Sequence, residues 1–260
     1  MKKIVFLMMA CTLLAGMNAC KSNSNKTEPT ATADNSRNSL DWNGTYYGVL
    51  PCADCPGIET IITLKADNTY EMTSHYQDTG EEDIFVYSGE FQWAENGGSV
   101  ILKNADGNNN SRKLKVGEDK LFWLDADGKM ISGDLAENYI LRKVNSELVE
   151  KYWKLIEIFG EPIKPDDIQS DAYITLHILG NRVNGNLGCN SFFGKYELRG
   201  ENQIKFSSVG STMMMCMNIT VEDKMKQVLE QADSYYVQND TLVLNRARMA
   251  PLAKFVAVYM

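Results

Sequence analysis

Cysteine is the residue type through which this 260-residue chain could most readily do chemistry. Cys52 and Cys55 form a C-x-x-C pair, and Cys189 and Cys216 lie far from it along the chain. Two thiolates can bind Cu(I) or another soft metal, exchange their disulfide with a partner thiol, or remain a structural disulfide. A single C-x-x-C motif leaves these roles open, because a four-ligand zinc site would need a second pair nearby.

In an oxidising compartment we expect two disulfides, Cys52–Cys55 and Cys189–Cys216, one in each half of the chain. The chain-entropy model assigns a stabilisation of about 3.6 kcal/mol to the longer loop and about 1.9 kcal/mol to the shorter one. Closing a ring across only two intervening residues also strains the shorter bond. The Cys52–Cys55 bond is therefore the one more readily reduced or exchanged for a metal.

The sequence around Cys52 argues against a thiol enzyme. Active cysteines of this spacing usually begin a helix, whose dipole lowers the thiol pKa, whereas here Pro56 and Gly57 follow and residues 58–64 read as a strand. The chain also lacks the G-x-S-x-G, H-E-x-x-H and glycine-rich nucleotide motifs. We therefore predict no catalytic residue.

Residues 213–217 (M-M-M-C-M) are a second set of potential soft ligands. In a strand, alternate side chains face one way, so Met213, Met215 and Met217 could converge on Cu(I). Methionine also fills irregular cores, and we expect core packing for this run. His75 and His177 have no visible partner in the sequence, and we expect both to be ordinary strand residues rather than ligands or bases.

The N-terminus has the pattern of an export signal. Two lysines precede an apolar stretch over residues 4–15, and Ala19 precedes Cys20, so we predict a signal peptide over 1–19 and lipidation of Cys20. Ordinary secretion with a free Cys20 is the alternative, whereas cleavage before Cys11 would leave too short an apolar core. The stretch is also shorter than the ~18 to 20 residues that a membrane-spanning helix needs.

Residues 20–40 are polar and should form a flexible tether behind the lipid. By resemblance to the sorting of Gram-negative lipoproteins, Lys21 in place of aspartate favours the outer membrane, with the protein facing the periplasm. The chain has 26 basic and 34 acidic side chains, a formal net charge of -8, which argues against a nucleic-acid partner. The oligomeric state is left open.

Two β-rich domains follow, so the fold class is mainly β. Residues 41–145 contain short runs of alternating polarity between turn residues and no helical spacing, which predicts a small barrel of up-and-down strands. Such a barrel is wide enough for one small ligand. The eight predicted strands are 45–50, 57–64, 68–76, 83–92, 98–103, 111–116, 119–125 and 137–143.

Residues 150–260 mix strands with one helix, which predicts an α+β domain. The apolar residues Val221, Met225, Val228, Leu229 and Ala232 recur at helical spacing and should lie across a sheet, and Thr220 with Asp223 resembles a capping box. The predicted strands are 152–158, 172–179, 181–187, 194–199, 202–209, 240–245 and 252–259.

Two resemblances add to these predictions. The segment L-P-C-A-D-C-P-G-I at residues 50–58 resembles the N-terminal domain of the NlpE family of copper-homeostasis and adhesion lipoproteins. That resemblance implies a lipocalin-like barrel, a copper or redox role for Cys52 and Cys55, and an envelope-stress sensor protein as partner. G-C-N-S-F-F-G-K-Y at residues 188–196, with S-T-M-M-M-C at 211–216, resembles the META (HslJ-like) domain, which is linked with stress tolerance.

The leading hypothesis is a non-enzymatic outer-membrane lipoprotein that senses or buffers envelope stress, with copper as its possible cofactor at Cys52 and Cys55. One alternative is a periplasmic carrier that holds a small apolar ligand in its barrel. Another is an interaction scaffold that docks a partner through the second domain.

Overall fold

The structure is a computed structural model, and the residues it describes are 34–78, 83–105, 110–200, 202–247 and 250–259. The predicted signal peptide, the predicted lipidation site Cys20 and the tether up to residue 33 lie outside these ranges. No helix among the described residues is both long and apolar enough to span a lipid bilayer.

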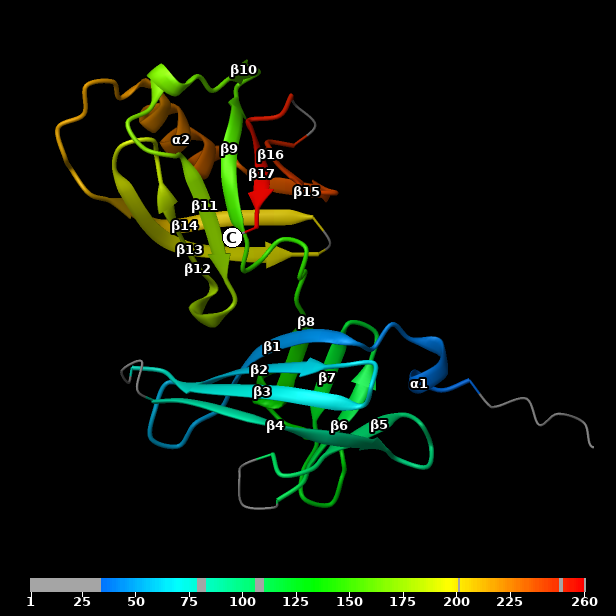
Figure 1. The fold of residues 1–260 in the computed structure, drawn as a ribbon. Coiled ribbons are helices and arrows are strands. Elements are labelled where there is room, and N and C mark those ends of the chain that lie inside the picture. The colour runs from blue at the N-terminus through cyan, green and yellow to red at the C-terminus, as the bar shows by residue number, and fades with distance from the viewer. Residues whose placement is uncertain (1–33, 79–82, 106–109, 201, 248–249, 260) are drawn as a thin grey trace, which may run out of the picture. The chain divides into compact units, whose positions relative to one another are not determined.

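The first domain is a closed barrel of eight antiparallel strands, as predicted, in which β8 pairs back with β1 (Figure 1). The ends of the strands differ from the prediction by a few residues, most at β8, where the 3₁₀ helix η2 (Ala136–Tyr139) replaces its predicted start. The strands are β1 (Gly44–Leu50), β2 (Ile58–Leu64), β3 (Thr69–Tyr76), β4 (Ile84–Trp93), β5 (Ser99–Leu102), β6 (Arg112–Gly117), β7 (Lys120–Trp123) and β8 (Ile140–Lys143).

Alternating polarity decides which side chains fill the barrel. Ile62 on β2 and its register partner Met72 on β3 are buried, whereas the next residue pair, Thr63 and Glu71, faces outward. The turn between these strands places Asn68 at a φ of 64°, a conformation that asparagine tolerates well. Local turn chemistry and the two-residue period therefore set the same register.

One end of the barrel is closed by residues that lie within the predicted tether and just after it. Helix α1 (Ser36–Ser39) donates a hydrogen bond from the Ser36 hydroxyl to the carbonyl oxygen of Val116 at 2.8 Å. Trp42 then packs edge-on against Phe91 and Trp93, with ring centroids 5.8 and 5.3 Å apart. Residues 34–40 are thus part of the barrel domain rather than a free linker.

The second domain is a nine-stranded antiparallel sheet in which β17 pairs with both β16 and β9, so that the sheet curls upon itself (Figure 1). All seven predicted strands are present, and β10 and β15 are additional. The elements are β9 (Tyr152–Ile158), β10 (Glu161–Pro162), η3 (Pro165–Asp167), β11 (Tyr173–His177), η4 (Leu179–Asn181), β12 (Arg182–Asn186), β13 (Ser191–Arg199), β14 (Gln203–Ser211), α2 (Thr220–Gln231), β15 (Ser234–Gln238), β16 (Thr241–Asn245) and β17 (Ala253–Val258).

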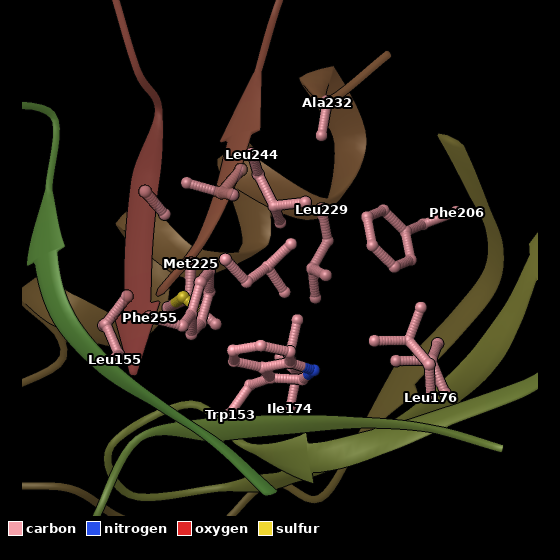
Figure 2. Packing of buried hydrophobic residues seen from close by; sticks show 14 of the residues in the cluster. Trp153, Leu155, Ile174, Leu176, Phe206, Met225, Leu229, Ala232, Leu244 and Phe255 are labelled. Atoms are coloured by element: carbon pink, nitrogen blue, oxygen red, sulfur yellow. The ribbon is translucent and has the colours of Figure 1, made fainter. Parts of the chain in front are cut away.

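Helix α2 inserts its apolar stripe into the core of this sheet, as predicted. Met225 and Leu229 gather there with Trp153 and Phe255, all four at most 1% exposed (Figure 2). The predicted capping box is wrong, because Ile219 is the N-cap and makes no side-chain capping bond. Instead, the side chain of Asn218 accepts a hydrogen bond from the Thr220 amide at 3.0 Å.

Candidate functional site

The C-x-x-C pair lies in the loop between β1 and β2, at the end of the barrel opposite α1 (Figure 1). Cys52 and Cys55 are joined by a disulfide with their Cα atoms 5.3 Å apart, and both are half-buried. The loop leads into strand β2, so no helix dipole acts on either sulfur. Because both cysteines are half-buried rather than enclosed, a small reductant or metal complex could reach this pair.

Gly57 fixes the exit of this loop. Its carbonyl oxygen accepts a hydrogen bond from the Gln77 amide at 2.9 Å, which ties the loop to the end of β3. A Cβ at Gly57 would lie 2.5 Å from a methyl carbon of Val49, so only glycine fits without movement of its neighbours. The loop that carries the disulfide is therefore anchored at Gly57, two residues after its second cysteine.

A cavity of about 570 Å³ opens at the same end of the barrel. Its volume is in the range of small-molecule sites. Leu50 and Ile58, which flank the disulfide loop, contribute to its wall, and Tyr76 and Phe85 at the tips of β3 and β4 pack edge-on with centroids 5.9 Å apart. The rest of the wall comes from Thr60, Met72, Ser74, Asp83, Tyr87, Ala105, Arg112 and Trp123.

The cavity wall is mainly apolar with a few polar groups. Arg112 holds its guanidinium 5.9 Å from the ring centroid of Trp123, which is within range of a cation–π contact. The sequence predicted that a barrel of this size could hold a ligand, but not which side chains would form the wall. Those residues come from six different strands and their connections, so only the closed topology brings them together.

Both histidines lie at the predicted strand positions and have partners that the sequence did not reveal. His75 Nδ1 lies 3.0 Å from Oε2 of Glu59, and the Tyr47 hydroxyl donates a hydrogen bond to Oε1 of the same carboxylate at 2.9 Å. His177 Nδ1 lies 3.0 Å from Oε2 of Glu150. Each pairing crosses between segments that are distant in sequence, where periodicity gives no signal.

The second disulfide, Cys189–Cys216, belongs to a buried polar network in the curled sheet. Asn190 accepts hydrogen bonds through Oδ1 from the Met214 amide at 2.7 Å and the Thr212 hydroxyl at 2.9 Å. Its Nδ2 donates to Oε2 of Glu222 at 3.0 Å. One asparagine thus connects the start of β13, the loop before α2 and α2 itself.

Glu222 is the charged member of this network and is only 5% exposed. Burial raises the pKa of its carboxyl, but hydrogen bonds from Lys226 and Asn190 outweigh that effect and hold the pKa below its usual value. The carboxylate and the two sulfurs of Cys189 and Cys216 are close enough to share a metal. With the sulfurs bonded to each other, however, no thiolate is present to bind one.

Two domain-family models match the two halves of the chain. The model of the NlpE N-terminal domain matches residues 46–134, and that of the META domain matches residues 146–259. Residues 46–134 are thus an NlpE N-terminal domain, and residues 146–259 are a META domain.

Individual relatives match only part of the chain. Lipoprotein NlpE of Escherichia coli (strain K12) is 35% identical over 105 residues, which are 40% of this chain and 42% of that protein. This chain therefore spans less than half the length of that relative. A crystal structure of a Shewanella oneidensis protein described as a lipoprotein is 48% identical and covers 43% of this chain and 97% of its own, with a TM-score of 0.38. The crystal structure of the Cpx pathway activator NlpE from Escherichia coli is 21% identical, with 63% and 94% covered and a TM-score of 0.31.

The methionine run of the META domain is exposed, so the prediction of core packing is wrong. Met213, Met215 and Met217 are 93%, 100% and 95% exposed. The run forms an irregular loop rather than a strand, because Asn190 captures the backbone of Met214 and the disulfide fixes Cys216. Because these side chains extend almost entirely into solvent, their thioethers are not gathered into a preformed copper site.

This exposure predicts selective oxidation. Hydrogen peroxide should convert the thioethers of Met213, Met215 and Met217 to sulfoxides, with water as the other product, at least about tenfold faster than those of Met72 and Met225, since reactivity follows access to the sulfur. Met72 and Met225 are 4% and 0% exposed and serve as internal controls. Peptide mass spectrometry over a time course measures the rates. Equal rates at exposed and buried positions would contradict the loop structure.

The carboxylate of Glu222 predicts a pH dependence of stability. Because its folded-state pKa is lowered from 4.5, its ionised form stabilises the META domain above that pH, and this contribution is lost as the pH falls through the folded-state pKa. We expect the Glu222→Gln variant to lose less stability than the wild type between pH 5 and pH 3, in urea titrations at each pH. Glu230→Gln, on the exposed face of α2, is the control and should follow the wild type.

Proposed function

We propose that this chain is a lipid-anchored protein of the cell envelope that senses or buffers envelope stress. It would do so through Cu(I) binding or thiol redox chemistry at Cys52 and Cys55. The observation that carries the proposal is a half-buried disulfide in an anchored loop at the rim of the barrel cavity. The anchor would be the lipid on Cys20, the location the periplasmic side of the outer membrane, and the partner an envelope-stress sensor protein. The match to the lipoprotein NlpE supports this assignment over the barrel domain.

The chemistry needs two steps. A dithiol reductant of the envelope supplies two electrons and two protons, which split the Cys52–Cys55 bond into two thiols and leave the reductant as a disulfide. The two thiols then bind Cu(I) as thiolates and release their protons. Because the short loop contributes only about 1.9 kcal/mol through chain entropy, opening this bond should leave the barrel folded.

Titration of the reduced protein against a chromophoric Cu(I) chelator tests the proposal. Wild type should take about one Cu(I) from the chelator more tightly than the Cys52→Ser/Cys55→Ser variant. The Cys189→Ser/Cys216→Ser variant is the matched control and should retain wild-type competition. Equal competition by wild type and Cys52→Ser/Cys55→Ser would exclude Cu(I) binding by these two cysteines. Thiol trapping in cells then tests the redox arm, which fails if the pair stays oxidised under both copper load and reducing stress.

A second candidate function is a carrier, because the cavity is large enough for a ligand and mainly apolar. Native mass spectrometry of protein purified from its own envelope should then show a bound small molecule. In a Ser74→Trp variant, whose indole would fill part of the cavity, that extra mass should disappear. An empty barrel in every wild-type preparation would exclude the carrier.

A further inference from the structure

A second hollow, of about 600 Å³, lies on the META domain. It is formed by β11, β12, β13 and β14, and we call it the basic groove. Its lining residues are His177, Arg182, Val183, Asn184, Phe193, Gly194, Lys195 and Ser208. Among them, Val183 is completely buried in the core, whereas Arg182 and Asn184 on either side of it are exposed. The groove therefore lies on the outer face of the sheet, and the core does not need its side chains for packing.

Three basic residues form a row across neighbouring strands of the groove. In the strand register, His177 on β11 faces Arg182 on β12, and Arg182 faces Lys195 on β13. Neighbouring strands are about 4.8 Å apart, so the two permanent cations are direct neighbours, which is an unfavourable pairing. His177 is compensated by Glu150, but among the described residues neither Arg182 nor Lys195 forms an ion pair. This uncompensated pair stands out in a chain with excess acid.

The groove also has an apolar wall. Phe193 is 65% exposed, and its ring lies beside Gly210, where a Cβ would come within 3.1 Å of it. The register between β13 and β14 shifts between Phe193 and Lys195, and Ser208, opposite this shift, has a φ of 52°. A β-bulge of this kind redirects side chains and often lies beside a functional site. It leaves a serine hydroxyl and an exposed aromatic ring at the rim of a cationic hollow.

We propose that the basic groove binds a small amphiphilic anion, with its phosphate or carboxylate against Arg182 and Lys195 and its apolar part against Phe193. The guanidinium of Arg182 can form two parallel hydrogen bonds to either anion, and the ammonium of Lys195 adds a point charge. Asn184 and Ser208 supply neutral hydrogen-bonding groups beside them. The site does not involve Cys52 or Cys55, so the test of anion binding is independent of the test of the proposed copper and redox role.

Isothermal titration of the full chain with octyl phosphate, below its critical micelle concentration, tests the groove. The Arg182→Gln/Lys195→Gln variant should bind about tenfold or more weakly, since it loses charge-assisted hydrogen bonds. Phe193→Ser should weaken octyl phosphate but leave the weaker binding of inorganic phosphate unchanged. Arg199→Gln is the matched control and should bind as wild type does, because Arg199 is exposed and already paired with Glu197. Thermal melts confirm that each variant is folded.

Two results would overturn the proposal: equal binding of octyl phosphate by wild type and Arg182→Gln/Lys195→Gln, or equal affinity for octyl phosphate and uncharged octyl glucoside. A third arm identifies the source of the anion. Sedimentation with vesicles that contain phosphatidic acid, lost in Arg182→Gln/Lys195→Gln and absent with phosphatidylcholine alone, assigns the site to a lipid headgroup. Binding of octyl phosphate without binding to either vesicle assigns it to a free amphiphile.

Discussion

Replacing Cys189 and Cys216 by serine should lower the free energy of unfolding of the META domain by about 3.6 kcal/mol, because the unfolded chain regains the entropy of a long open loop. The bond joins the segment before β13 to the loop before α2. Opening it also frees Cys216 from its place beside Asn190. The effect should therefore be at least as large as the chain-entropy value.

The indole N–H signal of Trp153 in NMR spectra allows this loss to be measured in the full chain. Trp153 is completely buried in the META core and donates a hydrogen bond to the carbonyl oxygen of Leu148 at 2.7 Å, so its signal reports on that domain alone. Urea titration of the signal gives the free energy of unfolding. The Cys52→Ser/Cys55→Ser variant is the control and should leave this titration unchanged. A loss below about 1 kcal/mol in the Cys189→Ser/Cys216→Ser variant would contradict the expected role of the bond.

Replacing Asn190 by alanine should destabilise the same domain by about 3 kcal/mol, because several buried groups lose their partner at once. The Glu222 carboxylate would keep its contact with Lys226 but lose both side-chain hydrogen bonds from Asn190. The Met214 amide would lose its acceptor, Oδ1 of Asn190. Urea titration followed at Trp153 measures the change. Asn202→Ala, at an exposed position, is the control and should shift it by less than about 0.5 kcal/mol.

A charge variant separates the loss of hydrogen bonds from the loss of volume. Asn190→Asp keeps the shape of the side chain but places a second carboxylate 3.0 Å from that of Glu222. We expect strong destabilisation at pH 7 that is partly relieved as the pH falls toward 4, since one carboxyl then takes up a proton. An Asp variant as stable as wild type at pH 7 would show that Asn190 does not hold the carboxylate.

Much of the fold follows from local patterns in the sequence. Residues 58–64 form β2, within one residue of the predicted strand 57–64, because alternating polarity and turn residues both specify that strand. Strand β15 (Ser234–Gln238) escaped prediction, since only Tyr235 among its five residues is buried and so short a run carries little periodicity. Short strands are defined by their neighbours more than by their own residues.

Of the candidate sites, only the one whose residues are close in sequence could be predicted. The spacing of Cys52 and Cys55 is a local motif, so the pair could be identified directly. Arg182 and Lys195 become neighbours only through the register of β12 and β13, which no single segment encodes. The methionine loop was misjudged for the same reason, because the residue that determines its course, Asn190, lies more than twenty positions earlier.

The two ends of the barrel differ, because α1 and Trp42 cover one end and the disulfide loop lies at the other. The chain passes through α1 and Trp42 and then runs the length of β1 before it reaches the Cys52–Cys55 loop. The point where the chain enters the barrel and the opening of the cavity are therefore at opposite ends of the barrel (Figure 1). A reductant, a metal ion or a small ligand can therefore reach the Cys52–Cys55 loop and the cavity without passing α1 and Trp42.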